Sequence, residues 1–236
     1  MAKGLTGHSG RLQQIDHRVV KLAIGLIALF MAPCMWLIAG YKTPSISDSY
    51  YSPARDYFVG ALFAVGGLFL AVKGATVGER RLSLLASICA AVVATCPCYS
   101  SLAPDKGSAL HFPAAGILFA ILAYFCWAFR QRALQRIGPH TRANVRVKIY
   151  GLCLAGMVSM LPLAGYLLLN QEAVLKQYPS FIYWIELIGL VSFGISWLTA
   201  SRTLPIFAKP AERYRLFHSD QEVDVYAVEA DGEAYR

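Results

Sequence analysis

Charged residues are scarce in this sequence: they make up 15% of its 236 residues, whereas apolar residues make up 56%. Soluble domains carry a charge on about a quarter of their residues, so this composition excludes an ordinary soluble domain. Acidic residues are the rarer kind, with 14 Asp and Glu against 22 Lys and Arg, and the net charge is +8. The composition therefore predicts a membrane protein.

Several catalytic and binding motifs are absent. The chain has no G-x-S-x-G elbow, no H-E-x-x-H pair and no phosphate-binding Gly-Lys-Ser/Thr loop, which argues against the enzyme and nucleotide-binding classes that those motifs mark. It also has no pore-filter signature, no arginine-rich sensor helix and no detectable inverted repeat. Nucleic-acid binding lacks any motif despite the positive charge. From the sequence, the cofactor is unknown.

What the chain does contain is six long apolar stretches, at 19–40, 57–76, 83–103, 110–129, 149–169 and 181–200. Each has roughly 20 residues, enough for a helix to cross a hydrocarbon core about 30 Å thick. Within lipid the backbone has to satisfy its own hydrogen bonds, which favours helices over strands. We expect an all-α fold, a bundle of six transmembrane helices.

The Lys and Arg residues are unevenly shared between the segments that join these stretches. Eighteen lie at the two termini and in the second and fourth connections, and four lie in the other three connections. The positive-inside rule then places both termini in the cytoplasm. The expected organisation is a cytoplasmic arm (1–18), a six-span domain (19–202) and a cytoplasmic tail (203–236). The basic fourth connection is interpreted as a determinant of topology, and binding of anionic head groups is its alternative.

Small residues recur inside the stretches, where they would let neighbouring helices approach closely. They are Gly60, Gly66, Gly67, Gly189 and Gly194.

The six cysteines form no strong motif. Four lie within apolar stretches and are interpreted as small packing residues: Cys34, Cys89, Cys126 and Cys153. Cys96 and Cys98 form a C-x-C pair in "ATCPCYSS", for which a disulfide or a soft metal ion would be the chemical alternatives. At both positions we favour packing or redox-silent thiols.

The segment "SISDSYYSPARDYFVG" (45–60) places polar side chains directly before the second apolar stretch. Its tyrosines suit an aromatic belt at the membrane interface. Asp56 is expected to cap a helix that begins at Tyr57, and Arg55 is expected to pair with Asp48 or with a lipid phosphate. These roles are structural.

Ionisable residues also recur where the second, fourth and sixth stretches begin, all on the expected outer side: Asp56, His111 and Glu186. An acid as deep as Glu186 is costly to desolvate and should face the bundle and find a partner. We expect an outer pocket lined by Ser47, Asp48, Tyr51, Arg55, Asp56, His111 and Glu186. Its catalytic candidates are His111, Glu186, Asp56 and Asp48, which suit acid–base chemistry or one metal ion. The alternative is a hydrogen-bonded knot that fixes the helices.

Three segments carry a family resemblance: "SISDSYYSPARDYFVGALFAVG", "HFPAAGILFAILAYFCWAF" and "IYWIELIGLVSFGISWL". Together they resemble a group of functionally uncharacterised bacterial six-span membrane proteins, and the resemblance covers most of the membrane region but not the tail. It implies a bacterial cytoplasmic membrane as the location. Ile46, Ser47, Asp48 and His111 are more distantly similar to motif positions of the damage-regulated autophagy modulators and GPI-anchor remodelling factors. Neither resemblance implies an established activity.

Three functions compete at this point. The first is a membrane protein whose outer pocket binds a lipid or its head group, with membrane lipids as partners. The second is an enzyme that acts on lipid-linked substrates by acid–base or metal-assisted chemistry. The third is a small-solute or proton-coupled transporter, which rests on Glu186 alone.

Overall fold

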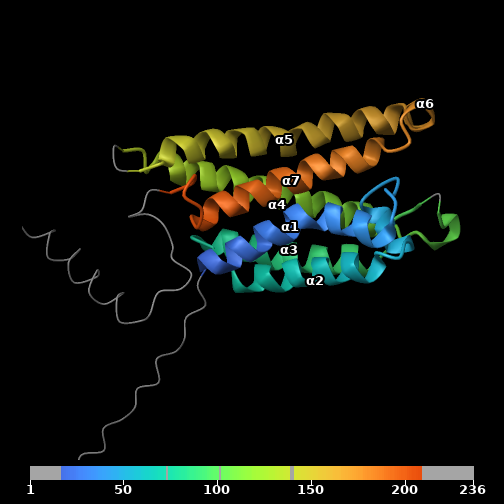
Figure 1. Ribbon diagram of the computed structural model, residues 1–236, viewed down its shortest axis with the longest axis horizontal. Coiled ribbons are helices and arrows are strands. Elements are labelled where there is room, and N and C mark those ends of the chain that lie inside the picture. Colours follow the sequence, from blue (N-terminus) through green and yellow to red (C-terminus); the bar gives the residue numbers. More distant parts are fainter. Residues whose placement is uncertain (1–16, 73, 101, 139–140, 209–236) are drawn as a thin grey trace, which may run out of the picture.

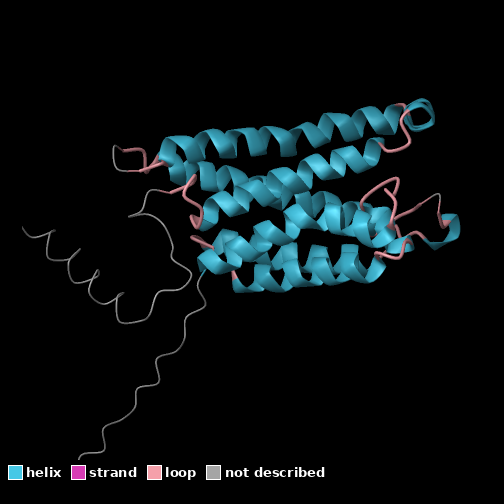
Figure 2. Cartoon of the chain, in the orientation of Figure 1, coloured by secondary structure: helices cyan, strands magenta, loops and turns pink. Residues whose placement is uncertain are grey.

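The computed structural model describes residues 17–72, 74–100, 102–138 and 141–208. Within these residues the chain is helical, with loops between the helices and no strand (Figure 2). The elements in chain order are α1 (His17–Ala39), η1 (Ser47–Tyr51), α2 (Arg55–Ala71), α3 (Val77–Thr95), η2 (Pro104–Lys106), α4 (His111–Leu134), α5 (Ala143–Leu169), α6 (Gln171–Gln177) and α7 (Phe181–Ser201). The predicted all-α class is confirmed.

The six long helices lie side by side in an up-and-down bundle (Figure 1). Each packs on its neighbour in the chain, and α7 packs on both α5 and α1, so the bundle closes into a ring. Helix α4 also contacts α7 across the ring. One end of the bundle, the loop end, holds residues 40–54, 96–100, 102–110 and 170–180. The other, the basic end, holds residues 17–21, 74–81, 130–138, 141–146 and 201–208.

All six predicted stretches coincide with helices, and their ends shift for local reasons. The largest shift is in the third stretch, expected to continue to residue 103, whereas α3 ends at Thr95. Pro97 disfavours helical backbone at the residue before it, which ends the helix. Helix α1 ends at Ala39, and Gly40 follows it with a φ of +75°, which suits glycine just after a helix C-terminus.

Four helices are long and apolar enough to cross a membrane: α1, α4, α5 and α7. Helix α2 has 17 residues, and α3 carries Glu79, Arg80 and Arg81 near its start. The outward faces of the bundle expose large apolar side chains, among them Leu37, Leu152 and Leu161, which are 73–81% exposed. Lipid contact is the environment in which such a surface is stable.

The core of the bundle is a cluster of aromatic side chains around Trp197, which is fully buried. The Trp197 ring meets Phe69, Phe125, Phe129 and Phe193 edge-on, with ring centroids 5.2–5.9 Å apart. Such pairs contribute beyond their buried area. They join α2, α4 and α7.

Close helix approach occurs at some of the predicted glycines and not at others. A Cβ added to Gly194 would lie 2.6 Å from the Leu29 side chain and 3.0 Å from the Gly25 carbonyl oxygen, so α1 and α7 touch there. Gly189 and Gly66 also face neighbouring helices. The prediction is wrong for Gly60 and Gly67, because no atom lies within 4 Å of an added Cβ.

Most of the predicted arm and tail falls in 1–16 and 209–236, which lie outside the described residues, so their predicted boundaries stay predictions. All six cysteines, which do lie in the described part, are free thiols. This is the state expected for Cys96 and Cys98.

Candidate functional site

The site at the loop end is built on residues 43–52, which fold back on themselves through side-chain hydrogen bonds. The Ser45 amide donates to Asp48 Oδ2, and the Asp48 amide donates to Ser45 Oγ, both at 3.0 Å. This reciprocal pair is typical of the start of a helix and explains why η1 begins here. Thr43 Oγ1 donates to the Ser45 carbonyl at 2.6 Å. The segment is therefore a preformed, rigid loop.

Glu186 on α7 anchors this loop to the bundle. Its Oε2 accepts the Ile46 amide at 2.5 Å and the Ser47 amide at 3.4 Å, and its Oε1 accepts the Ser47 hydroxyl at 2.9 Å. The predicted inward-facing acid thus finds its partner, which is the first turn of η1. The Tyr183 amide, one turn before Glu186, donates to the Pro44 carbonyl at 3.2 Å and holds the same loop.

Asp48 connects the loop to residues 96–110. Its Oδ1 accepts from Cys98 Sγ at 3.5 Å, and the Tyr51 hydroxyl donates to the Cys98 carbonyl at 2.9 Å. His111 is 2% exposed, and its Nδ1 lies 2.7 Å from the Cys96 carbonyl oxygen. A carbonyl only accepts, so Nδ1 carries the proton in this bond. Asp48 lies within electrostatic reach of His111.

Burial and charge change the titration of the groups in these loops. Burial, reinforced by the Asp48 carboxylate, raises the pKa of the Cys98 thiol well above its ordinary value. Burial also raises the pKa of the Tyr51 hydroxyl. Both groups stay protonated at neutral pH, so Cys98 donates to Asp48 and is a poor nucleophile.

Four of the seven predicted pocket residues lie on or against the loop in two hydrogen-bonded groups, Ser47 with Glu186, and Asp48 and Tyr51 with Cys98. We call these five residues the polar cluster. His111 lies beside it on the 96–110 loop. The polar groups of the cluster hydrogen-bond to one another or to residues 45 and 46 of the same loop.

Asp56 and Arg55 do not join the polar cluster. Helix α2 begins at Arg55 with Ala54 before it, so the predicted cap by Asp56 does not form, and Asp56 is exposed in the first turn. The predicted Arg55–Asp48 pair is also wrong. Arg55 instead donates to the Tyr50 hydroxyl at 2.9 Å and stacks 4.5 Å from that ring.

A cavity of about 80 Å³, which we call the central cavity, lies beneath the polar cluster. Fourteen of its sixteen lining residues are apolar, from α1, α2, α3, α4, α7 and Ile46; Ser47 and Glu186 are the two polar ones. Four of the six partly exposed lining residues are on α4 and α7: Ala115, Phe119, Glu186 and Leu190. Apolar cavities of this order stay dry and accept apolar groups.

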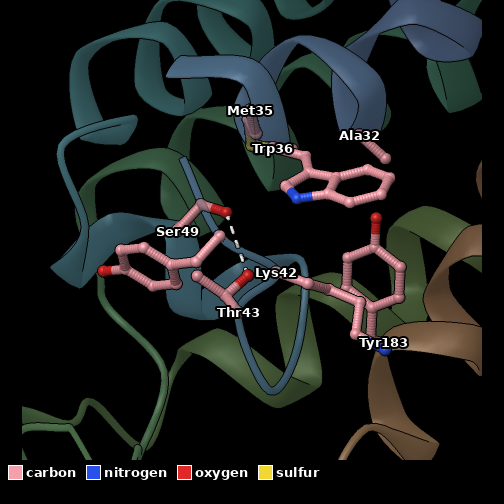
Figure 3. Close-up of a pocket in the computed structure, with 8 residues that line it drawn as sticks. Ala32, Met35, Trp36, Lys42, Thr43, Ser49 and Tyr183 are labelled. Atoms are coloured by element: carbon pink, nitrogen blue, oxygen red, sulfur yellow. Dashed lines mark hydrogen bonds between the residues drawn. The ribbon is translucent and has the colours of Figure 1, made fainter. Parts of the chain in front are cut away.

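A second, much smaller hollow lies between the end of α1 and residues 41–49 (Figure 3). Its volume is about 10 Å³, room for one water molecule at most. Figure 3 shows Trp36 and Tyr183 facing each other across it, with the Thr43–Ser49 contact beside them. Lys42 Nζ sits 5.5 Å from the centre of the Tyr183 ring. This hollow is too small for an organic ligand.

The chemistry open to the polar cluster is limited by how its groups are used. Two of the predicted catalytic groups, Glu186 and Asp48, accept hydrogen bonds from the loop that they fold, and a third, Asp56, lies apart. Among the described residues no group of three His, Cys, Asp or Glu side chains is placed to hold a metal ion. The arrangement is suited to holding the loop over the central cavity.

Comparison of the chain with protein-family models, with curated proteins and with solved structures finds no match in any of the three.

Sequence reasoning missed three features of this site. The main partner of Glu186 is a backbone amide, and because every residue except proline has one, the residue types do not identify this partner. The sequence predicts a packing or redox-silent thiol at Cys98 and gives it no polar partner, whereas the structure places its sulfur against Asp48. The central cavity has no sequence signal, because its walls are ordinary core residues from helices far apart in the chain.

Proposed function

We propose that the protein is a multi-pass membrane protein that binds a membrane lipid, holding an apolar part of it in the central cavity. The observation that carries the proposal is the cavity itself, whose apolar walls end at the Ser47 and Glu186 side chains. An apolar chain gains free energy by filling such a space. The carboxylate and hydroxyl at its end mark where the polar part of the lipid would begin.

Six spans with both termini in the cytoplasm are part of this proposal. The distribution of Lys and Arg supports it, and so does the even alternation of the six long helices between the two ends of the bundle. The loop end then lies at the outer membrane–water interface. A bacterial cytoplasmic membrane is the location that the family resemblance favours.

The partly exposed side of the cavity supports a lateral route for the lipid. Ala115 and Phe119 on α4 and Glu186 and Leu190 on α7 are lining residues that are partly exposed. Above them the loop is tied to α7 by Glu186 and to the loop before α4 by Asp48. A lipid chain would therefore reach the cavity where its lining is partly exposed, beneath this loop.

The test is to fill the cavity and measure the lipid that remains bound. Leu118→Trp places a bulky ring on the cavity wall, whereas Ile117→Trp places it on the outward face of α4, where Ile117 is 45% exposed. Each purified variant would be analysed by native mass spectrometry and lipid extraction, and its folding checked by thermal unfolding.

We expect lipid to co-purify with the wild type and with Ile117→Trp and to be largely lost from Leu118→Trp. Equal lipid in all three proteins, or none in the wild type, would contradict the proposal. Loss of lipid from both tryptophan variants would show that the measured lipid binds the outer surface of the bundle. That result would also contradict the proposal.

A further inference from the structure

Another cavity, of about 140 Å³, opens at the basic end of the bundle, opposite the polar cluster and the central cavity. We call it the basic cavity. It lies between α1, α4, α5 and α7, and its lining residues share a marked excess of positive charge. Five are cationic: Lys21, Arg132, Arg136, Arg146 and Arg202. The other four are Phe129, Ala133, Tyr150 and Ala200.

Helix register brings these cations together. Arg132 is in the last turn of α4, and Arg136 lies one turn beyond it in the chain. Arg146 is in the first turn of α5, with Tyr150 four residues later on the same face. Arg202 follows the last residue of α7 with a φ of +56°, which turns the chain at the edge of the cavity.

Three of the cations that line the basic cavity contact neighbouring residues that hold them in place. Two cations sit over the Phe129 ring, with Lys21 Nζ 5.4 Å and Arg132 Cζ 5.5 Å from its centroid. Arg132 also pairs with Glu79 on α3. Arg146 is 1% exposed, and its Nη1 donates to the Phe207 carbonyl at 2.8 Å. The basic groups are thus held in place by neighbouring residues.

The charge around this cavity favours an anion. Within the part of the chain that the structure describes, none of the nine lining residues is acidic, and the nearby Glu79 offsets Arg132. Lys21 and Arg136 add two further positive charges to the lining, and an anion between them would relieve their mutual repulsion. The guanidinium fork and the lysine ammonium are the two side-chain groups best suited to phosphate oxygens.

The size and position of the cavity narrow the class of anion. Its volume is about ten times the roughly 10–15 Å³ that one water molecule needs on the same measure. It lies at the ends of four long helices, the depth at which basic pockets between membrane helices meet lipid head groups. We propose that the basic cavity binds a phosphate-bearing anion, supplied by an anionic phospholipid or by a free phosphate ester. This site is independent of the central cavity.

The experiment measures how soluble probes stabilise the full chain in a neutral detergent. The probes are dioctanoylphosphatidylglycerol, dioctanoylphosphatidylcholine and inorganic phosphate, and the readout is the unfolding temperature against probe concentration. Arg136→Gln and Lys21→Gln each remove one lining cation. Arg81→Gln is the matched control, because Arg81 is exposed at the same end and does not line the cavity.

We expect phosphatidylglycerol to raise the unfolding temperature and phosphatidylcholine to leave it unchanged. Arg136→Gln and Lys21→Gln should each weaken the response by about fivefold, the effect of one basic residue near a charged surface. Because Arg136 is exposed, its variant tests the site even if Lys21→Gln does not fold. A strong response to phosphatidylglycerol alone identifies a lipid, and an equal response to inorganic phosphate identifies a free ester.

Three results would overturn the proposal. One is the absence of any response, and another is an equal response to phosphatidylcholine and phosphatidylglycerol. The third is an equal weakening by Arg81→Gln and Arg136→Gln, which would indicate diffuse surface charge. The chain also carries six acidic residues and no basic one between 220 and 233. If the wild type fails to respond and a full chain with these acids changed to amides responds, the chain's own segment is the occupant and the proposal fails.

Discussion

Glu186 shows how a single ionisable residue organises the loop end. Its carboxylate accepts two backbone amides and one hydroxyl from residues 46–47. A carboxylate in a membrane helix is costly unless it is paired in this way. The same bonds close the polar end of the central cavity, so the residue serves both the fold and the proposed lipid site.

Replacing Glu186 by alanine should therefore destabilise the protein. The donors of Ile46 and Ser47 would lose their acceptor, and each buried donor left unpaired costs about 1–3 kcal/mol. We expect Glu186→Ala to lower the free energy of unfolding by about 2–4 kcal/mol, measured by denaturant titration in detergent. Glu172→Ala, an exposed acid on α6 at the same end, is the control. Equal stability of the two variants would refute this role.

Cys98 provides a prediction on pH. Its side chain is 2% exposed, and burial together with Asp48 raises the pKa of the thiol above its ordinary value of 9.0. Because the thiol is favoured in the folded state, this contribution to stability is present below the unfolded pKa and is lost as the pH rises above it. The unfolding free energy of Cys98→Ser should therefore fall less than that of the wild type as the pH rises above about 9.

Labelling with a maleimide gives the independent measurement. Cys98 should stay unlabelled at neutral pH in the folded protein, while Cys96, which is half-buried beside it, reacts faster. Variants Cys96→Ser and Cys98→Ser separate the two signals. Rapid labelling of Cys98 at neutral pH would contradict the burial and charge that the structure assigns to it.

At the scale of elements, contacts between helices depend on a few close approaches. Helices α1 and α7 meet at Gly25 and Gly194. A Cβ on Gly25 would lie 2.9 Å from the Leu198 amide nitrogen and 3.0 Å from the Gly194 carbonyl oxygen. Backbone atoms cannot move aside cheaply, so a larger residue has to separate the helices.

Gly25→Ala should therefore destabilise the bundle by about 1–3 kcal/mol, as overpacking does in other cores. Gly116→Ala on α4 is the matched control, because no atom lies within 4 Å of its added Cβ. That variant should be neutral or stabilising, since alanine is the better helix former. Thermal unfolding of the two variants in the same detergent decides the point, and equal melting temperatures would contradict it.

The start of α3 illustrates how one side chain can serve two elements. Thr76 Oγ1 accepts the Glu79 amide at 3.1 Å, and Glu79 Oε2 accepts the Ala75 amide at 2.8 Å, which together cap the helix. The other Glu79 oxygen pairs with Arg132 on α4. Glu79→Gln should keep the Ala75 bond and lose the ion pair, whereas Glu79→Ala should lose both and cost about 1 kcal/mol more. The bond from the residue-79 amide to Thr76 stays in both variants, so equal stability would show that the Ala75 bond contributes nothing.

At the scale of the whole molecule, the six-span proposal requires that α2 and α3 cross the membrane together with α1, α4, α5 and α7. If they do, Arg80 near the start of α3 lies in the cytoplasm. If they do not, the segment between α1 and α4 stays on the outer side and Arg80 is exposed there. Arg80 and Lys106 are both exposed side chains, so each can be replaced by a reporter cysteine.

We expect a membrane-impermeant maleimide to label Lys106→Cys in intact cells whose outer barrier has been removed. Arg80→Cys should be labelled only after lysis, because six spans place it inside. The wild type measures the background from the six native cysteines. Labelling of both variants before lysis would support four spans, and labelling of Arg80→Cys alone would reverse the topology.

The sequence by itself determined the helices. A run of about 20 apolar residues can be counted along the chain, and its backbone has no other way to satisfy its hydrogen bonds in lipid. The ends of the helices were predicted less accurately. The third stretch runs to residue 103, eight residues beyond the end of α3 at Thr95, although Pro97 already indicates that the helix ends before it. Sequence also identified Glu186 as an inward-facing acid, because its depth demanded a partner.

Only the tertiary structure decided which groups meet. The partner of Glu186 is the amide of Ile46, 140 residues away, and every residue except proline has that donor. Asp56 and Asp48 have the same side chain and are eight residues apart, yet Asp56 is exposed and Asp48 is buried, because η1 turns the chain between them. The two cavities are likewise products of packing: their volumes depend on side chains from four or five helices, and no segment carries that information alone.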